Sequence, residues 1–304
     1  MNKLELQLKE FKPKVTQSTI NQYMLNLRKL YNSLYPEKKE PLDLAFLKQR
    51  DKILEILDSR PNNTKKNILN SIIVFTQILL KTVNVQSIKD TLEVYIKLRD
   101  ELNKEYFENG AKNIKTEKQS KNWMEYDEIN NIAKALKSKD FQAYVALSTH
   151  LYLPLRNDLP SLEVMTPSNY KKLDADEKRK TNALLRSPNK YVIKMNNYKT
   201  AGKYDEKTID IPPELNSMYK KLIKLNEGKK YLFINPKTDT RYNNNQWTLF
   251  FNKIFKHTGK KISTTLLRNI VLSHKYGDTL KQQKQDAKNM MHSIDTQKLY
   301  IKTD

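Results

Sequence analysis

Apolar residues recur at helical spacing through the first third of the chain. Ser18, a residue type that caps helices, precedes a segment whose apolar positions fall on a single stripe, which predicts a helix over 18–35: Ile20, Tyr23, Met24, Leu27, Leu30, Tyr31 and Leu34. Comparable spacing predicts helices over 63–81 and 87–107, and a shorter one over 43–59. Together these segments predict a small bundle of about four helices.

Residues 108–123 break this periodicity. The segment reads ENGAKNIKTEKQSKNW, with a glycine, several lysines and no apolar repeat. Such composition predicts an exposed basic linker over 108–122, which could equally lie along a phosphate backbone. We therefore expect a helical domain over 1–107 and a second domain over 123–304.

The second domain adds strands to helices. Helical spacing continues over 125–138, 140–153, 213–225, 244–258, 264–277 and 279–291. Within 190–200, Tyr191, Ile193 and Met195 alternate with more polar residues, which predicts a half-buried strand. A turn over 201–207 leads to a second strand that ends at Pro212 and Pro213, giving a β-hairpin. The expected fold class is mainly α with a small β-hairpin or sheet in the C-terminal domain (α+β).

The charge of the chain points to a polyanionic partner. The formal net charge is +22 over 304 residues and the pI is near 9.7, which favours nucleic acid first and an anionic membrane second. Part of this basicity follows the abundance of Lys, Asn, Ile and Tyr that an AT-rich genome encodes. A basic architectural protein would also explain the charge.

Composition excludes several kinds of chemistry. The chain has no cysteine, its four histidines are scattered, and its five glycines form neither a Walker loop nor a GxGxxG turn. We therefore expect no metal and no cofactor. No apolar run reaches membrane-spanning length and the first residues lack a signal-peptide core, so we expect a soluble intracellular protein without a membrane partner.

Two basic positions stand out in the first half of the second domain. Arg156 directly follows an apolar helix, and Asp158 could hold its guanidinium as a fork for phosphate oxygens, although an arginine between leucines is often a surface residue. Lys199 closes the first predicted strand and Lys203 lies in the turn. A lysine held on a rigid turn could protonate a leaving oxygen, whereas a solvated charge is the ordinary alternative.

Two further positions lie toward the C-terminus. Arg268 sits in a helix that is otherwise apolar, where a charge needs a partner or a pocket. His292 and Tyr300 are eight residues apart, which is a little over two turns of a continuous helix and places them on roughly one face. An exposed polar tail is the alternative for this last segment.

Taken in order, these residues suit phosphoryl transfer on DNA. Such a reaction requires charge neutralisation at the non-bridging oxygens, a proton donor for the leaving 5′-oxygen and a nucleophile. Two arginines, a lysine and a tyrosine supply all three without metal or cysteine.

The series resembles the tyrosine recombinase (phage-type integrase) family over nearly the whole chain. LPLRNDLPSL is similar to its first arginine box, the Lys199 hairpin to its catalytic β-hairpin, TTLLRNIVLSH to its His-x-x-Arg box, and MMHSIDTQKLY to its closing Gly-His-Ser…Tyr box. The resemblance implies a two-domain DNA clamp, with a SAM-like core-binding bundle over 1–107 and a catalytic domain over 123–304.

The resemblance also implies roles for individual residues. Tyr300 would attack the scissile phosphate and form a 3′-phosphotyrosyl link without ATP. Arg156 and Arg268 would clamp the non-bridging oxygens, with Asp158 orienting Arg156. Lys199 would be the general acid and His292 would hydrogen-bond the phosphate.

Three features depart from the family pattern. Thr265 stands where the family has a histidine, and His274, nine residues on, is a poor substitute by position; we expect weakened catalysis. Met291 replaces a glycine, which we expect to alter only local packing. The chain ends four residues after Tyr300, so the usual tail exchange between protomers is missing or the tyrosine segment itself is exchanged.

The resemblance implies a site-specific recombinase or integrase acting on double-stranded DNA as a homo-oligomer, a tetramer, in a nucleus, nucleoid or viral factory. A virus or mobile element is a compatible source. A type IB topoisomerase and a DNA-binding protein on a weakened recombinase scaffold are the alternatives. Tyr276 is the second choice of nucleophile. The basic residues expected to bind DNA are Lys203, Lys14, Arg28, Lys65 and Lys66.

Overall fold

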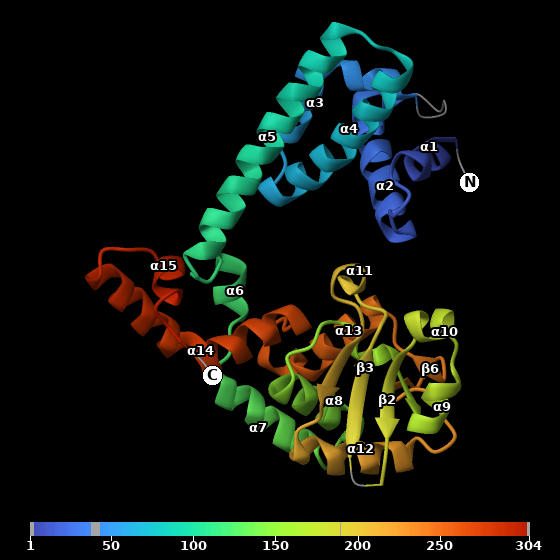
Figure 1. Cartoon of the computed structure of the whole chain (residues 1–304), viewed down its shortest axis with the longest axis vertical. Helices are drawn as coiled ribbons and strands as arrows, with labels where there is room; N and C mark the ends of the chain where they lie inside the picture. Colours follow the sequence, from blue (N-terminus) through green and yellow to red (C-terminus); the bar gives the residue numbers. More distant parts are fainter. Residues whose placement is uncertain (1–2, 38–42, 189, 303–304) are drawn as a thin grey trace. The chain divides into compact units, whose positions relative to one another are not determined.

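The computed structural model describes residues 3–37, 43–188 and 190–302, and divides into two compact units, Met1–Ile114 and Lys115–Asp304 (Figure 1). Each unit has its own hydrophobic core. The protein is mainly α-helical, with a small mixed sheet in the second unit, in agreement with the expected fold class.

All regular secondary structure among the described residues of the first unit is helical. The elements are α1 (Lys3–Phe11), α2 (Gln17–Leu34), the 3₁₀ helix η1 (Leu44–Lys48), α3 (Arg50–Asp58), α4 (Asn62–Thr82) and α5 (Gln86–Ala111). The predicted stripe of α2 is confirmed, because its apolar residues are buried or partly buried in the core. The single helix predicted over 43–59 is instead η1 followed by α3, and α1 was not predicted.

A buried polar contact fixes α2 against α4. The side-chain amide of Asn26 donates to the Ser71 hydroxyl at 3.0 Å and to the Asn67 carbonyl at 3.1 Å. Both Asn26 and Ser71 are buried. This pair satisfies polar groups that would otherwise be costly inside the bundle, and it sets the register of the two helices.

The segment predicted as an exposed basic linker over 108–122 is largely helical. Helix α5 continues to Ala111, and α6 (Glu117–Asn122) forms within the lysine-rich segment. A capping box starts α6, because Thr116 and Gln119 each bond the other's backbone N–H. The apolar pattern did not reveal α6, because this helix has no buried residue.

The second unit carries the remaining elements. Its helices are α7 (Tyr126–Leu136), α8 (Phe141–Tyr152), α9 (Pro167–Lys172), α10 (Ala175–Lys180), α11 (Ala201–Tyr204), α12 (Pro213–Leu225), α13 (Asn244–Ile254), α14 (Thr264–Asn289) and α15 (Ile294–Lys298), with 3₁₀ turns η2 (Leu159–Ser161) and η3 (Lys256–Thr258). Helix α14 spans both segments predicted as separate helices over 264–277 and 279–291, because Gly277 does not interrupt it.

The predicted hairpin belongs to a larger sheet. Strands β1 (Leu162–Met165), β2 (Asn182–Arg186), β3 (Tyr191–Met195) and β4 (Lys207–Asp210) lie in the order β1-β2-β3-β4, with β1 parallel to β2 and the other pairs antiparallel. The β3–β4 pairing confirms the hairpin. A second, two-stranded sheet joins β5 (Ile234–Asn235) and β6 (Thr240–Arg241).

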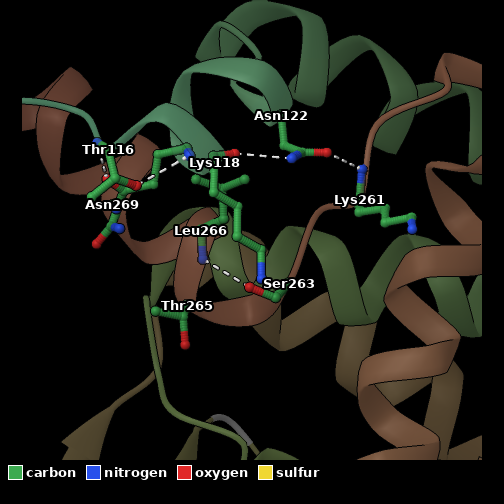
Figure 2. A pocket seen from close by; sticks show the side chains of 9 residues that line it. Thr116, Lys118, Asn122, Lys261, Ser263, Thr265, Leu266 and Asn269 are labelled. Carbon is green, nitrogen blue, oxygen red and sulfur yellow. Dashed lines mark hydrogen bonds between the residues drawn. The ribbon is translucent and has the colours of Figure 1, made fainter. Parts of the chain in front are cut away.

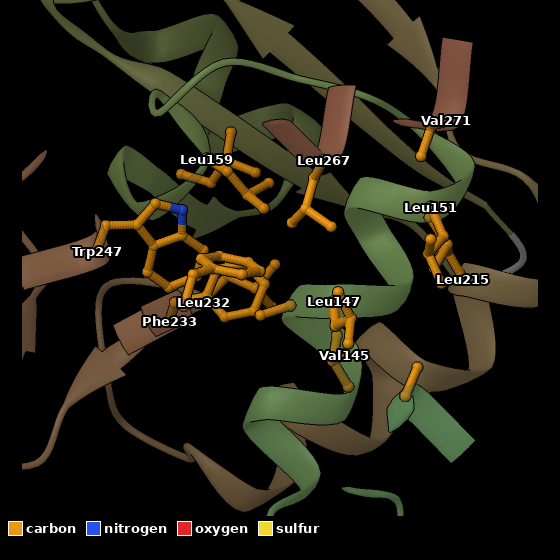
Figure 3. Packing of buried hydrophobic residues seen from close by; sticks show 14 of the residues in the cluster. Val145, Leu147, Leu151, Leu159, Leu215, Leu232, Phe233, Trp247, Leu267 and Val271 are labelled. Atoms are coloured by element: carbon orange, nitrogen blue, oxygen red, sulfur yellow. The ribbon is translucent and has the colours of Figure 1, made fainter. Parts of the chain in front are cut away.

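The core of the second unit forms around α8. Figure 3 shows Val145, Leu147 and Leu151 of α8 facing side chains of α12, α13 and α14. Trp247 and Phe251 of α13 are fully buried there, with their rings 5.2 Å apart. This packing holds the end of α8, which precedes the loop of Arg156, against the first turns of α14, which carry Arg268.

In the part of the chain that the structure describes, no helix combines the length and the apolar character that crossing a bilayer requires.

Candidate active site

The first arginine lies in a short loop after α8. The helix ends at Tyr152, and the Leu153 N–H bonds the Thr149 carbonyl at 2.7 Å. Pro154 prevents the residue before it from continuing the helix. Arg156 is exposed and Asp158 is half-buried, so this loop presents one cation to solvent above the end of α8.

The second arginine lies one turn into α14. Ser263 caps this helix by accepting a hydrogen bond from the Leu266 N–H at 3.2 Å. Arg268 is half-buried, and its Nη2 donates to Oγ1 of Thr265 at 3.1 Å. Its Nε is buried and has no hydrogen-bond partner among the described residues. Thr265 therefore orients Arg268 and offers no imidazole.

The two arginines and Asp158 share one electrostatic environment. Burial, and then the charge of Arg156, lower the pKa of Arg268, while Asp158 opposes them. Burial raises the pKa of Asp158 in spite of the attraction of Arg156 and Arg268. Among the described residues no ion pair joins Asp158 to either guanidinium, so the role predicted for it, orienting Arg156, stays a prediction.

A hydrogen bond fastens the Arg156 loop to the start of α14. The buried hydroxyl of Thr264 donates to the side-chain carbonyl of Asn157. Asn157 directly follows Arg156, and Thr264 lies in the first turn of α14, the helix that carries Arg268. Sequence reasoning missed Asn157, whose position beside Arg156 was its only signal.

Lys199 lies beyond the strand predicted to end with it. Strand β3 ends at Met195, and Lys199 is exposed in the loop that leads to α11. The Tyr198 hydroxyl braces this loop by donating to the Asp205 carbonyl at 2.6 Å. Lys203 falls within α11, and its side chain lies outside the described part of the structure.

His292 and Tyr300 lie together but not on one continuous helix. Helix α14 ends at Asn289 and the short α15 follows, so the chain folds back and the two rings stack with centroids 5.7 Å apart. The His292 Nε2 is buried without a hydrogen-bond partner among the described residues. Tyr300 is 65% exposed. The two residues therefore do not share the face of one continuous helix, which the sequence predicted, but meet because the chain turns after Asn289.

The end of α14 is built around Met291. This residue has a left-handed φ of 57°; its N–H bonds the Lys288 carbonyl at 3.1 Å, and the His292 N–H bonds the Ala287 carbonyl at 3.0 Å. These bonds form a Schellman motif, in which glycine is the preferred residue at the left-handed position. The expectation that Met291 alters only packing is therefore wrong, because it occupies a strained backbone conformation.

The His292–Tyr300 pair lies at the C-terminal end of α14, whereas Arg268 lies one turn after its start. Figure 1 shows α14 as one long helix with α15 at its far end. Ala287, which bonds the His292 backbone, follows Arg268 by 19 residues. At ~1.5 Å per residue this is about 28 Å along the helix axis. Tyr300 of this chain is therefore beyond hydrogen-bonding distance of a phosphate held by Arg268. Tyr276 is also exposed and lies eight residues, about 12 Å, along the same helix from Arg268.

Thr265 lines a polar pocket between α6 and the start of α14 (Figure 2). Lys118 of α6 and Lys261 and Ser263 before α14 contribute to its wall. The Asn122 side-chain carbonyl accepts from the Lys261 N–H at 2.8 Å, which ties α6 to the segment leading into α14. The lysine-rich segment thus supports the helix that carries Arg268.

Two histidines pack against aromatic rings. His150 is fully buried beside Phe251, with ring centroids 5.1 Å apart, and neither ring nitrogen has a hydrogen-bond partner among the described residues. Burial, with a contribution from Arg268, lowers the pKa of His150 to about 3. The His274 ring stacks on the Tyr126 ring at 4.1 Å.

The DNA-binding residues expected in the first unit differ in availability. Lys14 and Arg28 are exposed. Lys65 forms an ion pair with Asp58 at 3.2 Å, and the Lys66 ammonium lies 3.8 Å from the centre of the Tyr106 ring. Lys14 and Arg28 are thus more accessible to an added anion than Lys65 and Lys66.

Comparisons with known proteins leave the family open. No protein-family model and no curated protein matches the chain. Among solved structures, a crystal structure of XerA recombinase is similar with a TM-score of 0.36 and 14% sequence identity, covering 100% of this chain and 94% of that one.

Proposed function

We propose that this chain is a DNA breaking-and-rejoining enzyme of the tyrosine recombinase kind. The observation that carries the proposal is the hydrogen bond from Thr264 to Asn157, which ties the loop of Arg156 to the first turn of the helix that carries Arg268. Burial, and then the charge of Arg156, lower the pKa of Arg268. Two guanidinium groups held close together repel one another unless an anion lies between them. A phosphodiester, whose oxygens accept hydrogen bonds from arginine, is the anion that a chain of net charge +22 would bind.

The proposed reaction is an in-line exchange at phosphorus. The Tyr300 phenol oxygen forms a bond to the phosphorus and its proton passes to solvent, while the bond to the 5′-oxygen breaks. Lys199 supplies the proton that the leaving 5′-oxygen takes up. Attack of a 5′-hydroxyl on the phosphotyrosine reverses the step, so no cofactor is consumed.

The reaction requires Tyr300 to approach the two arginines. The distance along α14 means that the segment after Met290 either moves within its own chain or is supplied by a second copy. A homo-oligomer assembled on double-stranded DNA would provide the second copy. Three exposed apolar residues beside Tyr300 would gain a covering surface in that assembly: Met291, Leu299 and Ile301.

The test is covalent capture of DNA. Nicked duplexes with randomised sequence, together with the sequences that flank the gene, are incubated with the protein and resolved under denaturing conditions. We expect a protein–DNA adduct that is lost in Tyr300→Phe and reduced at least a hundredfold in Arg268→Ala. Tyr276→Phe is the matched control, since it removes another exposed phenol of the same unit.

Three outcomes contradict the proposal. An adduct that persists in Tyr300→Phe but disappears in Tyr276→Phe would move the nucleophile to the residue nearer to Arg268. Absence of any adduct, with DNA binding intact, would favour the second candidate, a DNA-binding protein without cleavage activity. The separation of Tyr300 from Arg268 is the observation that favours this candidate. Relaxation of supercoiled DNA without strand exchange would identify a topoisomerase instead.

A further inference from the structure

The loop that carries Lys199 is held by one buried carboxamide. Asn182, at the start of β2, is only 3% exposed. Its Oδ1 accepts hydrogen bonds from the backbone N–H of Asn196 at 2.9 Å and of Asn197 at 2.8 Å, and its Nδ2 donates to the Asn197 carbonyl at 2.8 Å. Three bonds therefore fix the backbone that leads from β3 into the loop.

The same side chain also reaches the Arg156 loop. The Nδ2 of Asn182 donates to the Ser161 hydroxyl at 2.7 Å, and that hydroxyl donates to the Asp158 carbonyl. Asp158 is two residues after Arg156. A continuous chain of hydrogen bonds thus joins the segment of the first arginine to the segment of the lysine, which are more than thirty residues apart in the sequence.

A second layer supports this connection. The side-chain amide of Asn196 donates to the Tyr170 hydroxyl at 2.8 Å, which donates to Glu206 at 2.6 Å. Glu206 also pairs with Lys194 at 2.6 Å. These contacts join the start of the 196–206 loop to its end, so the loop between them has a fixed base.

Only a carboxamide satisfies this arrangement. Asn182 uses its carbonyl oxygen as a double acceptor and its amide as a double donor, which exhausts its usual hydrogen-bonding capacity. An apolar residue there would leave the backbone N–H groups of Asn196 and Asn197 without these partners, and a carboxylate would face the Asn197 carbonyl and lose both donated bonds. The network therefore depends on the identity of this residue.

We infer that Asn182 is a positioning residue for the reaction: it holds Lys199 at a fixed place relative to Arg156, so that the proton donor and the phosphate clamp act on the same phosphodiester. The inference rests on the proposed function. A displacement of about 1 Å in such a group can reduce the rate about a hundredfold.

The first test does not depend on activity. Backbone hydrogen exchange of residues 196–200 is compared in the wild type, Asn182→Ala and Asn226→Ala. Asn226, whose amide donates to the Leu232 carbonyl at 3.0 Å, is the control for loss of a partly buried asparagine elsewhere in the unit. We expect Asn182→Ala to raise exchange of the Asn196 and Asn197 amides at least tenfold, and Asn226→Ala to leave it unchanged.

The second test reports on Lys199. A DNA substrate with sulfur in place of the bridging 5′-oxygen has a leaving group that needs no proton, so a defect in proton donation disappears on it. We expect Asn182→Ala to cleave ordinary DNA about a hundredfold more slowly than the wild type and the sulfur substrate within about threefold of it. Lys199→Ala should show the same rescue. Asn182→Asp, nearly isosteric, serves if the alanine variant does not fold.

Two results would overturn the inference. Unchanged exchange at Asn196 and Asn197 would show that the carboxamide does not fix the loop. An equal cleavage defect on both substrates would show that it does not act through Lys199. If the wild type forms no adduct on any DNA, the proposed function fails, and the exchange experiment alone decides whether Asn182 holds this loop.

Discussion

At the scale of single residues, Met291 holds a conformation that its side chain disfavours. Its φ is 57° and it is 93% exposed, so few contacts offset the steric cost of the left-handed region. We expect Met291→Gly to raise the free energy of unfolding by about 1 kcal/mol in urea titrations. Met290→Gly is the control, because Met290 has a φ of −84° and should be destabilised by glycine.

His150 makes stability depend on pH. The unfolded chain binds a proton at this ring near pH 6.5, whereas the folded protein resists it until about pH 3. Above pH 6.5 the ring is neutral in both states and does not affect the free energy of unfolding. Between pH 6.5 and about pH 3 the unfolded chain binds a proton that the folded protein does not, so the free energy of unfolding falls by about 1.4 kcal/mol per pH unit. We expect His150→Phe to remove this dependence.

The measurement is the difference in unfolding free energy between wild type and His150→Phe from pH 7 to pH 4. As the pH falls below about 6.5, the free energy of unfolding of the wild type should fall relative to that of His150→Phe. A constant difference across the range would mean that His150 takes up its proton at the same pH in the folded and the unfolded protein.

Sequence reasoning selected the charged residues of the candidate site but not the polar residues that contact them. Arg268 was recognisable because a charge in an apolar helix is unusual. Asn157 and Asn182 were not, since asparagine is common in this chain and their partners are distant in sequence. Whether an asparagine is solvated or fully bonded depends on contacts that only the folded chain provides.

At the scale of elements, local sequence patterns predicted β3 and β4 but not β2, the other neighbour of β3 in the sheet. Tyr191, Ile193 and Met195 alternate with less buried residues. Strand β2 is buried at four consecutive positions, Asn182–Leu185, so no alternation marks it. Helix α14 was predicted as two helices that divide after Gly277, whereas it is one helix from Thr264 to Asn289.

The contact of α13 with α8 offers an element-scale prediction. Phe251 is fully buried against Trp247 and His150, whereas the adjacent Phe250 is only partly buried. We expect Phe251→Ala to lower the free energy of unfolding by about 3–5 kcal/mol. Phe250→Ala should cost clearly less in the same urea titration. Equal losses would mean that α13 does not pack on α8 through Phe251.

At the scale of the whole molecule, we predict complementation between two inactive variants. Arg268→Ala keeps the tyrosine and Tyr300→Phe keeps the arginines, so a mixture can form a complete site only if the tyrosine segment is exchanged between copies. We expect the mixture to form the covalent adduct that neither variant forms alone. A mixture as inactive as its components, beside an active wild type, would mean that Tyr300 reaches the arginines of its own chain.

The division into two units was foreseeable only in part. The break in apolar periodicity after residue 107 pointed to a boundary, and the two compact units divide between Ile114 and Lys115. The helical character of α6 was not foreseeable from that pattern, because its role is to contact the segment before α14 through Asn122 rather than to bury an apolar face.

Under the proposed function, the position of Tyr300 at the far end of α14 bears on where and when DNA is cut. An enzyme of the proposed kind that is already complete in each free molecule would cut DNA wherever it landed. By contrast, a free molecule whose Tyr300 lies far from Arg156 and Arg268 would bind DNA without cleaving it. Under the proposed function, the control of DNA damage would therefore reside in the step that brings the tyrosine to the arginines, and variants that complete the site prematurely should be toxic to cells that express them.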